Sequence, residues 1–157
     1  MPLYVIDGQW WSPRDAANWP KVYVDLSGSG AQSLSSTATH QVVFSSHVNG
    51  NISPATGFSM EFIDKSFDLV QASDWNAGNS AQTLGRETAN TPPYGWYTYN
   101  TSTLANDAIV GRTVLVRNNT TGTLYAIKLI EFSNVSQTGS GPALLVKADA
   151  NIAFKLL

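Results

Sequence analysis

Apolar and polar positions follow the two-residue period of β-strands in several short segments of the chain. Residues 22–26 form a β-branched and aromatic run that ends at the turn-forming residues 27–30. Residues 41–48 alternate in the same way, and residues 49–51 (N-G-N) tolerate the positive φ angles of a turn. The pattern therefore predicts two strands, each followed by a turn.

The clearest predicted element is a β-hairpin over residues 113–132. Two apolar runs are joined by residues 118–122, a short Asn/Thr/Gly loop that is typical of a hairpin connection. The return strand is apolar on both faces, so we expect it to be central and covered on two sides. Residues 143–146 and 151–156 are predicted as the final strands.

Helical periodicity is confined to residues 64–72, where Asp64 could act as the N-cap of two turns. Residues 74–95 are rich in Asn, Gly, Ser and Thr and predict a long irregular loop. No repeat or change of composition marks a second domain, so we expect one β domain over residues 1–157. The predicted fold class is all-β, an antiparallel β-sandwich or β-roll with one long irregular loop and at most one short helix.

Composition narrows the possible partners. Charged residues make up 13% of the chain, about half the usual share, and the net charge is −2 without any basic run. Nucleic-acid backbones are bound mainly by clustered Lys and Arg, so we expect no nucleic-acid partner. No stretch approaches the roughly 20 apolar residues of a transmembrane helix. Residues 1–7 lack the basic and apolar regions of a signal peptide, so we expect no leader there.

Motifs for catalysis are missing from the sequence. There is no cysteine, no G-x-S-x-G elbow and no Walker-type G-K-[ST], and Gly28 and Gly30 lack the third glycine of a dinucleotide fingerprint. The acidic residues Glu61, Asp64 and Asp68 fit a solvated face or a helix cap better than a catalytic pair. We therefore expect no enzyme activity, no metal site and no resident cofactor.

His40 and His47 are the two imidazoles of the chain, so any histidine chemistry must use them. They are seven residues apart, and in one continuous strand an odd spacing places side chains on opposite faces. Such a strand would prevent them from sharing one metal ion or one haem face. Two interpretations stay open, a partly exposed strand histidine and a haem or metal ligand.

Clustered aromatic residues are candidates for contact with a partner. Trp10 and Trp11 lie in a loop-like stretch, and residues 94–99 (Y-G-W-Y-T-Y) follow a Pro-Pro turn. Such clusters form the lid of a core, an inter-subunit contact or a platform for a planar ligand such as a sugar. The candidate interface residues are Trp10, Trp11, Trp75, Trp96 and Tyr97.

Several segments also suggest a family. Residues 18–26 read N-W-P-K-V-Y-V-D-L, and residues 95–100 read G-W-Y-T-Y-N. Residues 114–129 form a strand–turn–strand that ends in K-L, and residues 151–157 form a closing aromatic strand. In this order, over about half of the chain, they resemble the HmuY-like family, all-β haem-binding lipoproteins of bacteria. The resemblance implies an all-β fold and the binding of haem.

The chain departs from this family at one strand. Residues 39–44 read T-H-Q-V-V-F where the family has W-D-I-A-F, so the Trp and the Asp are both replaced, and a lipobox cysteine is absent. No haem-ligating position can be carried over residue by residue. His40 and His47 are therefore candidate haem ligands only because they are the available imidazoles.

Two functions compete. The first is a non-catalytic structural or assembly subunit of a larger particle, such as a virion decoration, a tail component or a surface array. Its partners would be copies of itself or other structural proteins, in a virion or an extracellular particle. The alternative is a haem or small-ligand binding protein of the HmuY-like kind, at the cell surface or in the periplasm after removal of a leader. Low charge and the expected absence of a leader favour assembly.

Overall fold

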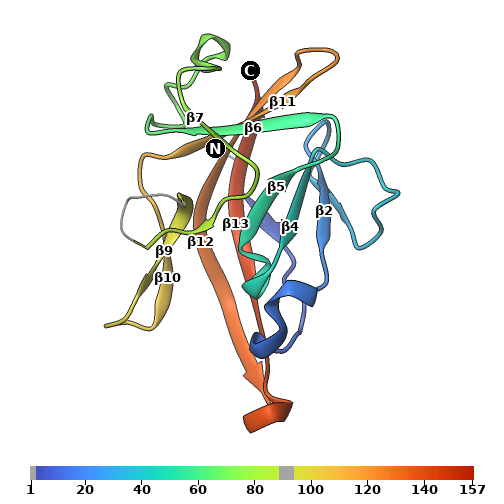
Figure 1. Cartoon of the computed structure of the whole chain (residues 1–157), viewed down its shortest axis with the longest axis vertical. Helices are drawn as coiled ribbons and strands as arrows, with labels where there is room; N and C mark the ends of the chain where they lie inside the picture. The colour runs from blue at the N-terminus through green and yellow to red at the C-terminus, as the bar shows by residue number, and fades with distance from the viewer. Residues whose placement is uncertain (1–2, 89–93) are drawn as a thin grey trace.

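The computed structural model describes residues 3–88 and 94–157, and it confirms an all-β protein built from two packed layers (Figure 1). The first layer is a six-stranded antiparallel sheet. Its strands, in spatial order, are β1 (Tyr4–Ile6), β13 (Leu145–Leu156), β12 (Leu124–Thr138), β11 (Thr113–Asn118), β6 (Phe58–Ile63) and β7 (Asn79–Ala81). The predicted hairpin is confirmed as β11 and β12, and β12 is central, as expected.

Two smaller sheets form the second layer. One contains β3 (Ala31–Ser33), β2 (Val22–Asp25), β4 (Val42–Ser45) and β5 (Asn51–Pro54), and the other contains β10 (Ala105–Ala108), β9 (Gly95–Asn100) and β8 (Gly85–Arg86). Ile52 and Leu84 join the two sheets, because each backbone N–H donates to the other residue's carbonyl at 2.9 Å. Between β8 and β9 the pairing is parallel.

The main core lies between the layers because apolar residues alternate on the inward faces of the strands. In β2 and β4 every second residue is buried, and Val24 and Phe44 are fully inaccessible. A second cluster covers the outer face of the six-stranded sheet, where Leu115 and Ala126 pack against Phe67. This explains the four consecutive buried residues at the start of β12, since that strand is covered on both faces.

Several predicted boundaries are corrected by the structure. The strand expected over residues 41–48 ends at Ser45, because Ser46 and Val48 adopt positive φ angles of 61° and 48°. The helix expected over residues 64–72 is replaced by a turn in which Leu69 N–H donates to Ser66, followed by a 3-10 helix at Ala72–Asp74.

The irregular loop and the end of the chain also contain more strand than expected. Residues 74–95 include β7 and β8, and residues 89–93 of that prediction lie outside the described residues. The two predicted final strands are one continuous strand, β13, in which residues 147–150 pair with β12 as well.

Helical residues are few. In the described part of the chain they occur in the 3-10 segments η1 (Pro13–Asn18), η2 (His47–Asn49), η3 (Ala72–Asp74) and η4 (Gly141–Ala143). No helix among residues 3–88 and 94–157 has both the length and the apolar character needed to cross a membrane.

The last part of β12 and the first residues of β13 form a two-stranded ribbon, residues 133–147, which we call the arm. Figure 1 shows the arm extending below the rest of the molecule, with η4 at its tip. Irregular register occurs between Leu129 and Glu131 and again between Ser133 and Ser136. Such bulges bend a strand, so β12 can leave the core and continue into the arm.

Candidate functional site

An open cleft of about 870 Å³ lies where the two layers meet the arm. One side is formed by the β4–β5 connection with His47 and Val48, and another by the β9–β10 hairpin with Tyr97 and Leu104. The arm and the adjoining parts of β12 and β13 complete the cleft with Phe132, Val135, Val146 and Ala148. We call this the interlayer cleft. Its lining is mainly apolar, and its size lies in the range that holds small ligands.

The β4–β5 connection has an unusual backbone where it borders the cleft. Ser46 has φ 61° and ψ −158°, a backbone region that residues other than glycine rarely adopt. The β-branched Val48 has φ 48°. Each such residue costs on the order of 1–3 kcal/mol and persists only when surrounding contacts hold it. Strain of this kind is concentrated at functional sites.

Hydrogen bonds from three other segments hold the strained connection in place. The Asn49 side chain accepts from the Gln9 N–H at 3.1 Å and donates to the Pro20 carbonyl at 2.7 Å. The indole N–H of Trp96 donates to the Gly50 carbonyl at 2.8 Å. The cleft therefore has one rigidly positioned side.

His47 lines the cleft, whereas His40 does not. The His47 ring meets Trp19 edge-on, with 5.4 Å between ring centroids, and although the residue is exposed, desolvation of its imidazole lowers the pKa. The lowered pKa favours the neutral ring, which keeps a nitrogen lone pair. The His40 Nδ1 lies 2.7 Å from the Ala38 carbonyl, and its ring packs against Tyr23. The structure does not bring the two histidines to one site.

Their separation has a different cause from the one predicted. His40 precedes β4 and His47 follows it in η2, so no continuous strand contains both residues.

Aromatic rings and one cation line the opposite side of the cleft. Tyr97 and Phe132 meet edge to face at 5.2 Å, and the guanidinium of Arg86 lies 5.2 Å from the centre of the Tyr99 ring. Burial raises the pKa of Tyr97, although the charge of Arg86 partly opposes this. Among the described residues no group of three or more His, Cys, Asp or Glu could hold a metal ion. This set of side chains suits an apolar contact with a polar margin.

The predicted interface residues fall into different environments. Trp10 is 40% exposed and lies beneath Lys147 of the arm, at 5.0 Å. Trp11 is half-buried against the arm, where its backbone pairs with Val146. Trp75 is half-buried on the outer face of the six-stranded sheet.

Trp96 is a correction to the predicted interface, because its side chain is 2% exposed and packs in the core against Phe44. Tyr97 is almost as buried and contributes one side of the interlayer cleft.

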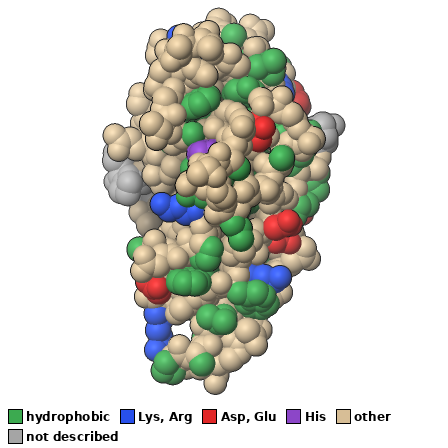
Figure 2. Space-filling view, turned by 90° about the vertical axis from the view of Figure 1, so that its right-hand side faces the viewer, with side chains coloured by type: hydrophobic (Ala, Val, Ile, Leu, Met, Phe, Trp, Pro, Cys, Tyr) green, Lys and Arg blue, Asp and Glu red, His purple; other side chains and the backbone are tan. Residues whose placement is uncertain are grey.

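Sequence patterns did not predict the exposed aliphatic residues at the cleft and in the turn before β11. Leu104 and Val135 are each 74% exposed, and Val110 is 94% exposed. Isolated large apolar residues among small or polar ones were the available signal, in T-L-A and N-V-S, but so short a pattern cannot show which face stays uncovered. Figure 2 shows one face of the molecule, where apolar side chains reach the surface at many points and charged side chains lie among them.

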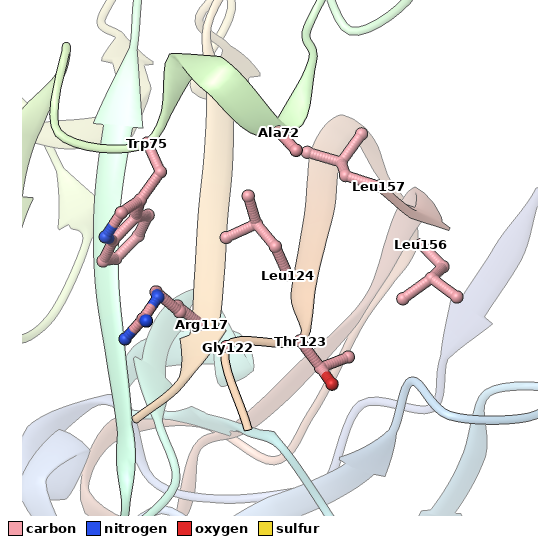
Figure 3. A pocket seen from close by; sticks show the side chains of 8 residues that line it. All are labelled: Ala72, Trp75, Arg117, Gly122, Thr123, Leu124, Leu156 and Leu157. Carbon is pink, nitrogen blue, oxygen red and sulfur yellow. The ribbon is translucent and has the colours of Figure 1, made fainter. Parts of the chain in front are cut away.

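A second recess, of about 410 Å³, lies on the outer face of the six-stranded sheet (Figure 3). Trp75 and Arg117 border it on one side, and Leu156 borders it on the other. Leu115 on β11 faces the same side as Arg117, whereas Val114 and Val116 face the main core. This outer recess is therefore separated from the interlayer cleft by the sheet itself.

The fold and the cleft define a two-layer β protein with an apolar opening between its layers. Comparison with models of protein families, with curated proteins and with solved structures found no match. The resemblance to the HmuY-like family thus stays a prediction from the segments quoted above.

Proposed function

We propose that this chain is a non-catalytic assembly subunit of a larger particle, and that the arm and the β9–β10 hairpin contact neighbouring subunits. The observation that carries the proposal is the exposure of Leu104 and Val135, which stand on either side of the interlayer cleft. Uncovered apolar side chains around a recess are typical of protein contact sites. Association would remove both side chains from water.

The backbone of the arm supports the same proposal. Beyond Ile127, β12 pairs on one edge only, with β13, as far as the described residues extend. An isolated two-stranded ribbon is marginally stable in water, and a long unpaired strand edge is a template for another chain. A neighbouring subunit lying along the arm would stabilise it. We take other copies of this chain as the first partner to test, because no other component is needed.

Light scattering after size-exclusion chromatography, over a series of protein concentrations, tests self-assembly. We expect species larger than a monomer that dissociate in Val135→Lys, since a charge would have to be buried at the contact. Leu34→Lys is the matched control, because Leu34 is 61% exposed but lies outside the cleft and the arm. A monomer at every concentration would contradict self-assembly, as would equal effects of the two substitutions.

A second candidate function is the binding of haem or another planar ligand in the interlayer cleft. It is favoured by a neutral imidazole at His47 beside an apolar cavity, with Arg86 available for an anionic group. Titration with haemin, followed at the Soret band, tests it. We expect a shifted band that is lost in His47→Ala and kept in His40→Ala. The absence of a shifted band in the unsubstituted protein would contradict this function.

A further inference from the structure

The outer recess combines the cationic side chain of Arg117 with a mainly apolar lining. Arg117 and Leu124 are cross-strand partners on β11 and β12, and the indole of Trp75 reaches the same recess from the segment after η3. Figure 3 shows the Trp75 ring above the Arg117 guanidinium on one side of the recess and Leu156 on the other side. Leu124 lies in the middle. A charged group and an apolar surface are thus presented to one space.

The guanidinium of Arg117 has no carboxylate within ion-pair distance in the part of the chain that the structure describes. The ion pairs there use Lys65 and Arg112 instead. On β6, the cross-strand partner of Arg117 is the neutral Ser59. Glu61, one step further along the same face, is 2% exposed and accepts the Asn76 N–H at 2.7 Å.

A half-buried arginine that has no carboxylate beside it among the described residues favours an external anion. Its two parallel N–H groups match the geometry of a carboxylate. A phosphate dianion is a poorer match, because no second Lys or Arg lines the recess within the described residues. The charge balance therefore points to a single carboxylate at Arg117.

The other side chains that line the recess favour a ligand whose uncharged part is apolar. Trp75 offers a flat aromatic surface, and Ala72, Leu124 and Leu156 offer aliphatic ones. Burying an apolar group against these side chains removes both surfaces from water, which contributes roughly 25 cal/mol per Å². A recess of about 410 Å³ has room for a molecule with one ring rather than for a haem-sized ligand.

We propose that the outer recess is a binding site for a small organic acid, with a flat apolar body against Trp75 and its carboxylate on Arg117. This site is independent of the proposed assembly function, because it lies on the other side of the six-stranded sheet from the interlayer cleft.

Titration of the ¹⁵N-labelled protein with phenylacetate, followed by NMR, tests the proposal. We expect saturable shifts of the backbone amides of Gly122, Thr123 and Leu157 and of the Trp75 indole N–H, which Trp75→Phe assigns by removing that signal. The neutral isostere 2-phenylethanol should bind about ten-fold or more weakly, since a charge-assisted hydrogen bond is lost. Equal binding of the acid and the alcohol would overturn the role of Arg117, and the absence of localised shifts would overturn the site.

Substitutions of Arg117 test whether its charge binds the ligand, independently of any effect on folding. Arg117→Gln should weaken phenylacetate binding about ten-fold or more, whereas Arg117→Lys keeps the charge and should retain part of the affinity. Arg14→Gln is the matched control, because Arg14 is exposed and lies outside the recess. Unchanged dispersion of the amide spectrum reports that each variant is folded. Unaltered affinity in Arg117→Gln would overturn the proposal.

Discussion

The guanidinium of Arg112 lies 2.6 Å from the carboxylate of Glu87 in the protein interior, where the two side chains are 4% and 6% exposed. Arg112 also donates to Asp64 at 2.7 Å and to the Gly95 carbonyl at 2.8 Å. Its charge lies over the Phe62 ring, 4.4 Å from the ring centre. One side chain thereby joins the start of β11 to the ends of β6 and β8 and to the start of β9.

We expect Arg112→Met to lower the free energy of unfolding by roughly 3–5 kcal/mol, because Glu87 would stay buried without a partner. Urea unfolding followed by circular dichroism measures the change. Arg14→Met, at an exposed arginine, should stay within about 0.5 kcal/mol of the parent protein. The double variant Arg112→Met/Glu87→Leu should recover part of the loss, and equal losses in the single and double variants would contradict the pairing.

Ser46→Gly should raise the free energy of unfolding by about 1 kcal/mol, since Ser46 occupies a backbone region that glycine adopts without a steric cost. Ser45→Gly is the matched control one residue earlier, in the extended strand β4. There the added freedom of glycine should cost about 0.5–1 kcal/mol. Destabilisation of equal size in both variants would show that Ser46 is not strained.

Gly95→Ala should be destabilising because of the close approach between β8 and β9. A Cβ at this position would lie 2.2 Å from the Gly85 carbonyl oxygen, so the strands would have to move apart. We expect a loss of about 1–3 kcal/mol in thermal or urea unfolding. Gly28→Ala, where a Cβ meets nothing within 4 Å, should change stability by about 0.5 kcal/mol or less.

Glu61 predicts a pH dependence of stability. Desolvation raises its pKa above the ordinary value of 4.5, although hydrogen bonds from Asn76 and Gly78 partly oppose this. The carboxyl group of Glu61 then binds its proton more tightly in the folded state than in the unfolded state. Its contribution to the free energy of unfolding is therefore fully present below pH 4.5 and is lost as the pH rises through the folded-state pKa. Glu61→Gln removes this titration while keeping an oxygen for the Asn76 N–H.

We therefore expect Glu61→Gln to be more stable than the parent protein at pH 7 and to lose that advantage as the pH falls towards 4.5. Urea unfolding at a series of pH values measures the difference between the two proteins. A difference that is constant with pH, or one that grows on acidification, would contradict the raised pKa.

The strands were predictable where a local pattern determines them. The alternation in residues 22–26 and the Asn/Gly loop at residues 118–122 identified β2 and the β11–β12 hairpin. The end of β4 was not predictable, because Val48 has high β propensity and its positive φ is imposed by packing. Short strands such as β8 depend on partners far away in the chain, which a local pattern does not contain.

The interlayer cleft was only partly predictable, for a similar reason. Tyr97 and His47 were identified as candidates by residue type, yet the cleft needs Leu104 and Val135 as well. These residues come together through tertiary packing, not through spacing in the sequence. Trp96 is the opposite case, a residue that the sequence marks as a candidate and that lies in the core. Its indole N–H donates to the buried Gly50 carbonyl, so the whole side chain can be buried.

The pairing of β1 with β13 has a consequence for biosynthesis. Tyr4 lies opposite Ile152, so the edge of the six-stranded sheet joins two segments that are far apart along the chain and are synthesised at different times. Contacts between such distant residues slow folding, because a long loop must close before they form. We expect β1 to stay unpaired until β13 has been synthesised, which makes the nascent chain dependent on chaperones for longer than a fold of equal size with mainly local contacts.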